Sequence, residues 1–100
     1  MADFSYVVES RRAEKQRKRA RLAGRRAELM VNQWLYILLS WRGRCAYCGA
    51  PADTMDHIVP ICNGGGTTKT NVLPCCHECN QAKGTAVWLP AQVGEAVVKW

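Results

Sequence analysis

This 100-residue sequence has few acidic residues, and it lacks long apolar runs and a secretory start. Eight Asp and Glu stand against fourteen Lys and Arg, and the resulting net charge of +6 favours a polyanionic partner. The longest apolar stretch, residues 34–39, is far shorter than the roughly 20 residues of a membrane-spanning helix. Residues 1–10 lack the basic start and apolar run of a signal peptide. We therefore expect a cytoplasmic protein with no membrane partner.

Cysteine, in contrast, is abundant, with six residues in the chain. A chain this short has room for one small core and commonly needs disulfides or a metal to hold it. In a reducing compartment cysteine pairs hold zinc more often than they form disulfides. All six cysteines and both histidines follow residue 44, whereas eleven of the basic residues precede residue 45. The sequence therefore predicts a basic helical arm with a packing helix at 1–43 and a cysteine-rich module at 44–100.

Local patterns predict two helices in the arm. Ser10 is a candidate N-cap for a helix over 11–23, with Gly24 bending or weakening its end. A second helix is expected over 25–41, because apolar residues recur there every three or four positions and mark one packing face: Met30, Trp34, Ile37 and Trp41.

The cysteine-rich module, in contrast to the arm, is expected to contain strands. Residues 54–58 and 71–73 are expected to form short strands joined by a glycine-rich loop. A short helix is expected over 76–83, with Gly84 as its C-terminal stop. The tail, 90–100, is expected to form one more short helix.

Two C-x2-C pairs, Cys45/Cys48 and Cys76/Cys79, are typical of a four-cysteine zinc site, which is coordinatively closed and therefore structural. Two disulfides or unpaired thiols are the alternative. Cys76 is preferred to Cys75 as a ligand because only Cys76 completes the C-x2-C spacing. Cys75 and Cys62 are then interpreted as buried, inert thiols. His77 is interpreted as a solvated side chain or a phosphate contact, not a ligand.

Several short motifs follow one another across the same region. In chain order they are Asp56-His57-Ile58-Val59-Pro60, Gly64-Gly65, Asn71-Val72-Leu73, Asn80 directly after Cys79, and Lys83-Gly84. This ordered set, interleaved with the cysteine pairs, resembles the HNH endonuclease family, in the subtype whose ββα-metal finger is braced by a four-cysteine zinc. The resemblance covers residues 45–84 and implies an α+β fold, here preceded by the basic helical arm.

The resemblance also implies roles for individual residues. His57 would act as general base on the attacking water, while Asp56 and Asn80 would hold one catalytic divalent metal, Mg²⁺ or Mn²⁺. Asn71 would be structural and tie the loop between the strands. The expected reaction is hydrolysis of DNA, by nicking or double-strand cleavage, to 5′-phosphate and 3′-hydroxyl ends in a bacterial or phage-infected host cell. Imidazole suits a base near neutral pH, and a hard divalent ion prefers oxygen ligands.

Each assignment has a structural alternative. Asp56 would then be a surface acid, His57 a structural histidine near the zinc, and Asn80 a helix cap. Lys83 would either contact phosphate or be solvated.

The basic arm is the expected nucleic-acid contact. On a helix its side chains would surround most of the surface and suit phosphates of duplex DNA with weak sequence preference. The alternatives are a solvated helix or disordered tail with no partner, or a contact with RNA or an acidic protein. The residues concerned, with Lys83, are Arg11, Arg12, Lys15, Arg17, Lys18, Arg19, Arg21, Arg25 and Arg26.

Two other functions remain open at this point. The chain would be a non-catalytic zinc finger that binds nucleic acid, or an accessory subunit of a larger nuclease complex. A homodimer is a further expectation, because one active site cuts one strand.

Overall fold

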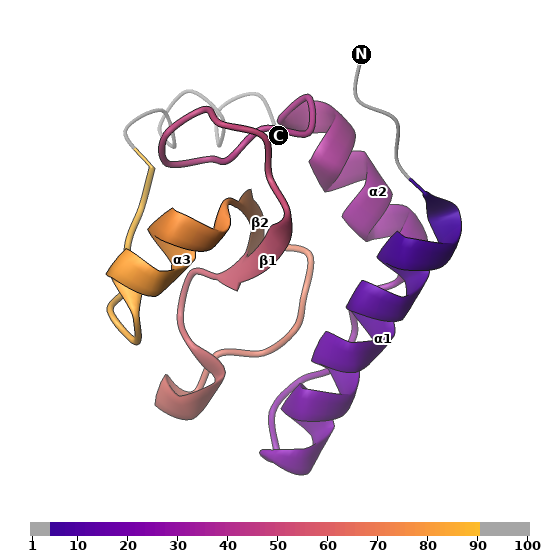
Figure 1. The fold of residues 1–100 in the computed structure, drawn as a ribbon. Coiled ribbons are helices and arrows are strands. Elements are labelled where there is room, and N and C mark those ends of the chain that lie inside the picture. Colours follow the sequence, from indigo (N-terminus) through magenta and orange to yellow (C-terminus); the bar gives the residue numbers. More distant parts are fainter. Residues whose placement is uncertain (1–4, 91–100) are drawn as a thin grey trace.

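The structure, a computed structural model, describes residues 5–90. The helix expected over 90–100 lies outside the described residues. Helices α1 (Tyr6–Leu22) and α2 (Val31–Ser40) come first in the chain. Strands β1 (Thr54–His57) and β2 (Val72–Cys75), the short 3-10 helix η1 (Ile61–Asn63) and helix α3 (His77–Lys83) follow (Figure 1). This is the α+β fold that the sequence predicts.

Helix α1 begins earlier than expected. Ser5 is its N-cap and accepts a hydrogen bond from the backbone N–H of Val8, at 3.3 Å. The prediction that Ser10 caps the helix was therefore wrong, because Ser10 lies inside the second turn. Glu9 in the first turn and basic residues in the last turn suit the helix dipole. Gly24, with φ +72°, follows the end of the helix and does not bend it.

Residues 25–30 are not helical, and so the second helix is shorter than predicted. Their backbone bonds instead to Thr67, far along the chain. Thr67 N–H donates to the Arg26 carbonyl at 2.8 Å, and the N–H groups of Glu28 and Leu29 donate to the Thr67 carbonyl at 3.0 Å. These long-range bonds satisfy groups that a continuous helix would have used internally. Helix α2 starts only after them.

The two strands pair antiparallel, and α3 follows directly to complete a ββα unit. The register sets His57 opposite Val72 and Asp56 opposite Leu73. Cys76 is the N-cap of α3, and Gly84 ends the helix with φ +56°. Both strands and this helix were predicted to within three residues.

The main core joins the arm to the ββα unit. Trp34 and Ile37 of α2 are buried as predicted and pack with Met55 of β1 and Val72 of β2. The indole Nε1 of Trp34 also donates to Glu9 Oε1 at 2.8 Å, which ties α2 to α1. Met30, expected on the packing face, is instead 58% exposed because it precedes α2 as its N-cap. Within residues 5–90, no helix is both long and apolar enough to cross a bilayer.

Candidate nuclease site

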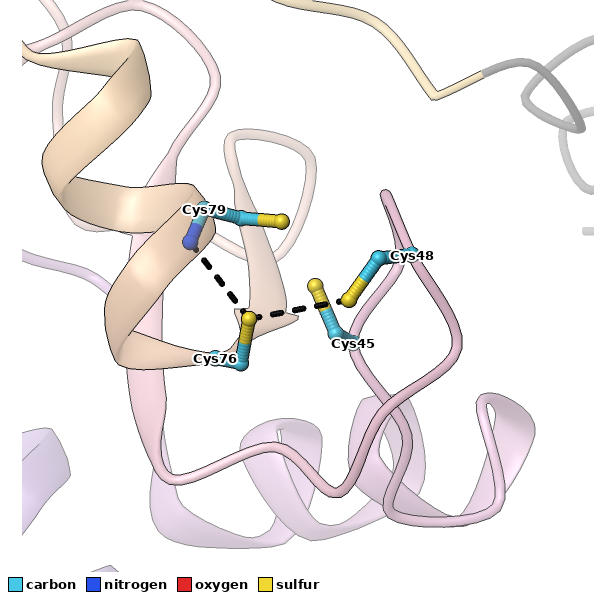
Figure 2. Close-up of side chains that lie close together, drawn as sticks. All are labelled: Cys45, Cys48, Cys76 and Cys79. Carbon is cyan, nitrogen blue, oxygen red and sulfur yellow. Dashed lines mark hydrogen bonds between the residues drawn. The ribbon is translucent and has the colours of Figure 1, made fainter.

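The four cysteines of the two C-x2-C pairs converge on one point (Figure 2). Cys45 and Cys48 lie on a tight loop before β1, where Gly49 has φ +81° and the Cys45 N–H donates to the Ala50 carbonyl. Cys76 and Cys79 lie at the start of α3. All four sulfur atoms are within 4.8 Å of one another, which places them to hold one metal ion.

The sulfur separations fit zinc. Cys48 Sγ and Cys76 Sγ are 3.6 Å apart. Tetrahedral zinc with Zn–S bonds of about 2.3 Å requires sulfur atoms about 3.8 Å apart. All six cysteines, each within the described residues, are free thiols, which argues against the disulfide alternative.

Backbone donors prepare this cluster for a cation. Burial by itself would raise the pKa of Cys45, but hydrogen bonds from the backbone of Cys76, Cys48 and Tyr47 lower it to about 6. The Cys76 side chain and burial raise the pKa of Cys79. A bound cation would favour the thiolate form of these cysteines.

The structure distinguishes the two remaining cysteines. Cys75 is completely buried in β2 and is outside the metal-binding group, as predicted. Cys62 is exposed, so the interpretation of Cys62 as a buried thiol was wrong. It lies in η1, at the rim of the cavity described next.

A cavity of about 990 Å³ separates α1 from the ββα unit. Asp56 and His57 of β1 line it together with Asn80 and Lys83 of α3. Residues 56 and 57 are neighbours in a strand, where side chains alternate between faces. Both are nevertheless among the residues that line this cavity, at the end of β1. Asp56, which is 3% exposed, is therefore not the surface acid that one alternative required.

Asp56 is held by two side chains that the sequence analysis did not connect with it. The Tyr47 hydroxyl donates to Asp56 Oδ2 at 2.5 Å, and Lys83 Nζ lies 3.2 Å from Asp56 Oδ1. Burial and the Asp56 carboxylate raise the pKa of Tyr47, so this phenol stays protonated as a donor. Lys83 also donates to the His57 carbonyl at 2.8 Å. Lys83 is buried, and the solvated alternative was wrong.

The His57 imidazole is buried and points toward the arm. Its Nε2 is 2.9 Å from Thr67 Oγ1, and Thr67 in turn contacts α1. Burial lowers the pKa of His57 to about 4, with a further contribution from the positive charges of Arg19 and Lys83. The imidazole is therefore neutral near pH 7, the state that a proton acceptor requires.

The two asparagines make different contacts. Asn71 accepts from the Val59 N–H at 2.9 Å and donates to the carbonyls of Val59 and Gly66, which closes the loop after β1. Gly65 must be glycine there, because an added Cβ would lie 1.7 Å from the Val59 carbonyl oxygen. Asn80 donates from Nδ2 to Thr54 Oγ1 at 3.1 Å. This bond directs the side-chain amide nitrogen of Asn80 to β1.

The nine basic residues between positions 11 and 26 divide into two groups. Four line the cavity across from Asp56 and His57: Arg11, Arg12, Lys15 and Arg19. The others are not among the residues that line it: Arg17, Lys18, Arg21, Arg25 and Arg26. Arg17 bonds to Glu14 and to the Leu29 carbonyl, and Arg25 bonds to the Ile61 carbonyl. His77 is exposed and also outside the lining, in agreement with a solvated side chain.

Sequence reasoning missed Tyr47, Thr54 and Thr67. Tyr47 lies inside the first cysteine pair and Thr67 in a loop of glycine and threonine, so neither belongs to a motif. Their contacts are with residues 9 to 51 positions away. Only the folded chain reveals them.

Taken together, the ββα unit and the cysteine cluster define a small α+β finger with four cysteines placed to hold a metal ion. A family model described as HNH endonuclease matches residues 45–92. The resemblance seen in the motifs is thus confirmed over this region.

The CRISPR-associated endonuclease Cas9 of Corynebacterium diphtheriae is 47% identical to this chain over 53 residues. The match covers 45% of this chain and 5% of that protein. The chain therefore corresponds to only a small part of the curated relative that it matches.

Proposed function

We propose that this protein is a metal-dependent DNA endonuclease or nickase that hydrolyses phosphodiester bonds to 5′-phosphate and 3′-hydroxyl ends. One observation carries the proposal: Asp56, His57 and Asn80 line a single cavity whose other wall is basic. A base, oxygen donors for a cation and positive charge for phosphates are what hydrolysis of a polyanionic ester needs. In this proposal residues 44–100 contain the catalytic unit and residues 1–43 supply the basic wall.

His57 is the proposed general base. Its imidazole is neutral near pH 7, buried against α1 and part of the cavity wall, so it accepts a proton from a water molecule beside the scissile phosphate. The Thr67 hydroxyl and the surrounding burial keep the ring from turning away.

Asp56 and Asn80 are the proposed ligands of a catalytic Mg²⁺ or Mn²⁺. A carboxylate and an amide oxygen are the donors that such hard ions prefer. Bound there, the ion would stabilise charge on the phosphate and on the departing oxygen. Tyr47 and Lys83 hold the Asp56 carboxylate in position before any substrate arrives.

The cysteine cluster is proposed to hold structural zinc. Four thiolates leave no open position for a substrate, so this ion would brace the fold and take no part in hydrolysis. The first cysteine loop bonds to β2, with the Ala46 N–H donating to the Pro74 carbonyl at 3.0 Å. Zinc bound here would join the segments that precede β1 and follow β2.

A supercoiled-plasmid assay tests the proposal. Full-length protein is incubated with EDTA, Mg²⁺ or Mn²⁺, beside H57A and the matched control H77A. We expect relaxed or linear product that needs the added metal, persists in H77A and is lost in H57A. The ratio of relaxed to linear product separates nicking from double-strand cleavage. Absence of cleavage by folded, zinc-loaded protein would instead indicate a non-catalytic binding module or a subunit that needs a partner.

A further inference from the structure

Thr67 links the proposed base to the N-terminal arm. This threonine lies in the loop between β1 and β2 and is completely buried. Its Oγ1 is 2.9 Å from His57 Nε2 and also 2.9 Å from the carbonyl oxygen of Gln16, in the middle of α1. The hydroxyl therefore stands between the catalytic strand and a helix that lies outside residues 45–92.

The direction of these two bonds follows from the number of hydrogens. A carbonyl oxygen only accepts, so Thr67 must donate its single hydroxyl proton to Gln16. Thr67 then has only lone pairs for His57, and His57 Nε2 must carry a proton to bond with it. In the neutral imidazole the other nitrogen, Nδ1, is left with the free lone pair.

We propose that Thr67 is a positioning residue that connects the Gln16 carbonyl of α1 to the His57 imidazole by two hydrogen bonds. Thr67 thereby fixes the Nε2–H tautomer of His57 and leaves Nδ1 of His57 to accept the proton. This inference rests on the proposed function, since it assigns the nitrogen that acts as base. It also makes α1 part of the catalytic apparatus as well as a basic surface.

The arm holds the backbone of Thr67 as firmly as its side chain. The Thr67 N–H donates to the Arg26 carbonyl, and its carbonyl accepts from Glu28 and Leu29. The adjacent Gly66 permits this approach, because an added Cβ would lie 2.8 Å from the Arg26 carbonyl oxygen. The backbone N–H, the backbone carbonyl and the hydroxyl proton of Thr67 therefore all form hydrogen bonds with residues of the arm.

The tautomer can be read directly by NMR of the imidazole ring nitrogens. The chain contains only two histidines, so H77A assigns the signals of His57. We expect wild type and T67S to show His57 protonated at Nε2 and unprotonated at Nδ1. In T67V, which keeps the shape but loses the hydroxyl, we expect a mixture of tautomers. T68V is the matched control, because within residues 5–90 the Thr68 hydroxyl has a hydrogen bond with Thr70 alone.

Cleavage kinetics provide the second readout. Loss of the partner that orients a functional histidine commonly costs about 10- to 100-fold, and we expect T67V to lower kcat by that factor at unchanged KM. T67S should restore kcat and T68V should leave it unchanged. A wild-type protein with His57 protonated at Nδ1 would overturn the inference, and so would a folded T67V with wild-type tautomer and kcat.

The two measurements separate this inference from the proposed function. If wild-type protein fails to cleave DNA, the endonuclease proposal fails, while the ring nitrogens still report whether Thr67 fixes the tautomer. If T67V fails to fold, the wild-type and T67S spectra decide, because each must show the Nε2–H form.

Discussion

The ammonium group of Lys83 lies 3.2 Å from Asp56 Oδ1, and both side chains are almost completely buried. The pair joins α3 to β1 at the centre of the proposed active site, and the same ammonium bonds to the His57 carbonyl. A charge buried in this way depends on its partner, because water is not available to replace it.

We expect K83M to destabilise zinc-loaded protein when no other divalent cation is present. Removing one partner of a buried ion pair commonly costs about 3–5 kcal/mol, because the other charge stays buried and uncompensated. Urea denaturation measures the change, and K69M, at an exposed lysine, is the matched control with an effect below about 0.5 kcal/mol. The double variant D56N/K83M should recover part of the loss. Equal stabilities of K83M and K69M would contradict the prediction.

The arm and the ββα unit share one core, and Trp34 is its largest buried side chain. We expect W34A to lower the free energy of unfolding by about 3–5 kcal/mol, as cavities left by large core residues do. The cause is lost packing against Met55 and Val72 and loss of the hydrogen bond to Glu9. Y36A on the exposed face of α2 is the control. A small effect of W34A in thermal and urea denaturation would mean that this core contributes little.

Metal content tests the choice of ligands in the cysteine cluster. We expect C76S and C79S to lose zinc and to unfold the module, because binding and folding are coupled. C75S and C62S should retain one zinc per chain, since neither residue belongs to the converging group. Elemental analysis and circular dichroism of the purified variants provide the measurement. Retention of zinc by C76S, or its loss from C75S, would reassign the fourth ligand to Cys75.

The division of the basic residues predicts a difference between two triple variants. Replacing the cavity-side residues Arg11, Lys15 and Arg19 by Gln should weaken DNA binding and flatten its salt dependence. Three lost phosphate contacts change the slope of log K against log salt by about 2.7. Replacing Lys18, Arg21 and Arg26 by Gln removes the same charge away from the cavity and should change the slope much less. Equal slopes for the two variants would mean that the arm binds by overall charge and not through the cavity.

The sequence predicted best what short spacings determine. The cysteine pairs, the strand carrying Asp56 and His57 and the helix between Cys76 and Gly84 are local patterns, and the structure contains all of them. The choice of Cys76 over Cys75 followed from spacing and agrees with the observed cluster.

The errors occur where distant residues decide the local structure. Residues 25–30 contain good helix formers, yet their backbone groups bond to Thr67. Helix propensity carries no information about such a partner. Lys83 lies at the end of a helix, where lysine side chains are ordinarily solvated, but the fold buries it between Asp56 and the His57 carbonyl. Each of these outcomes depends on contacts between residues more than 25 positions apart.

The cysteine cluster has a consequence for how the chain tolerates change in length. A bound ion would close a loop of the 27 residues between Cys48 and Cys76, so the ends of the β1–β2 hairpin would stay together whatever the loop between them contains. Doubling the length of a flexible loop costs only about 0.6 kcal/mol in closure entropy. Gly64 is exposed, and its φ of +100° favours glycine, so residues would be inserted after it and not in its place. An insertion after Gly64 should therefore be accommodated with little loss of stability, whereas one beside Thr67 would separate His57 from the arm.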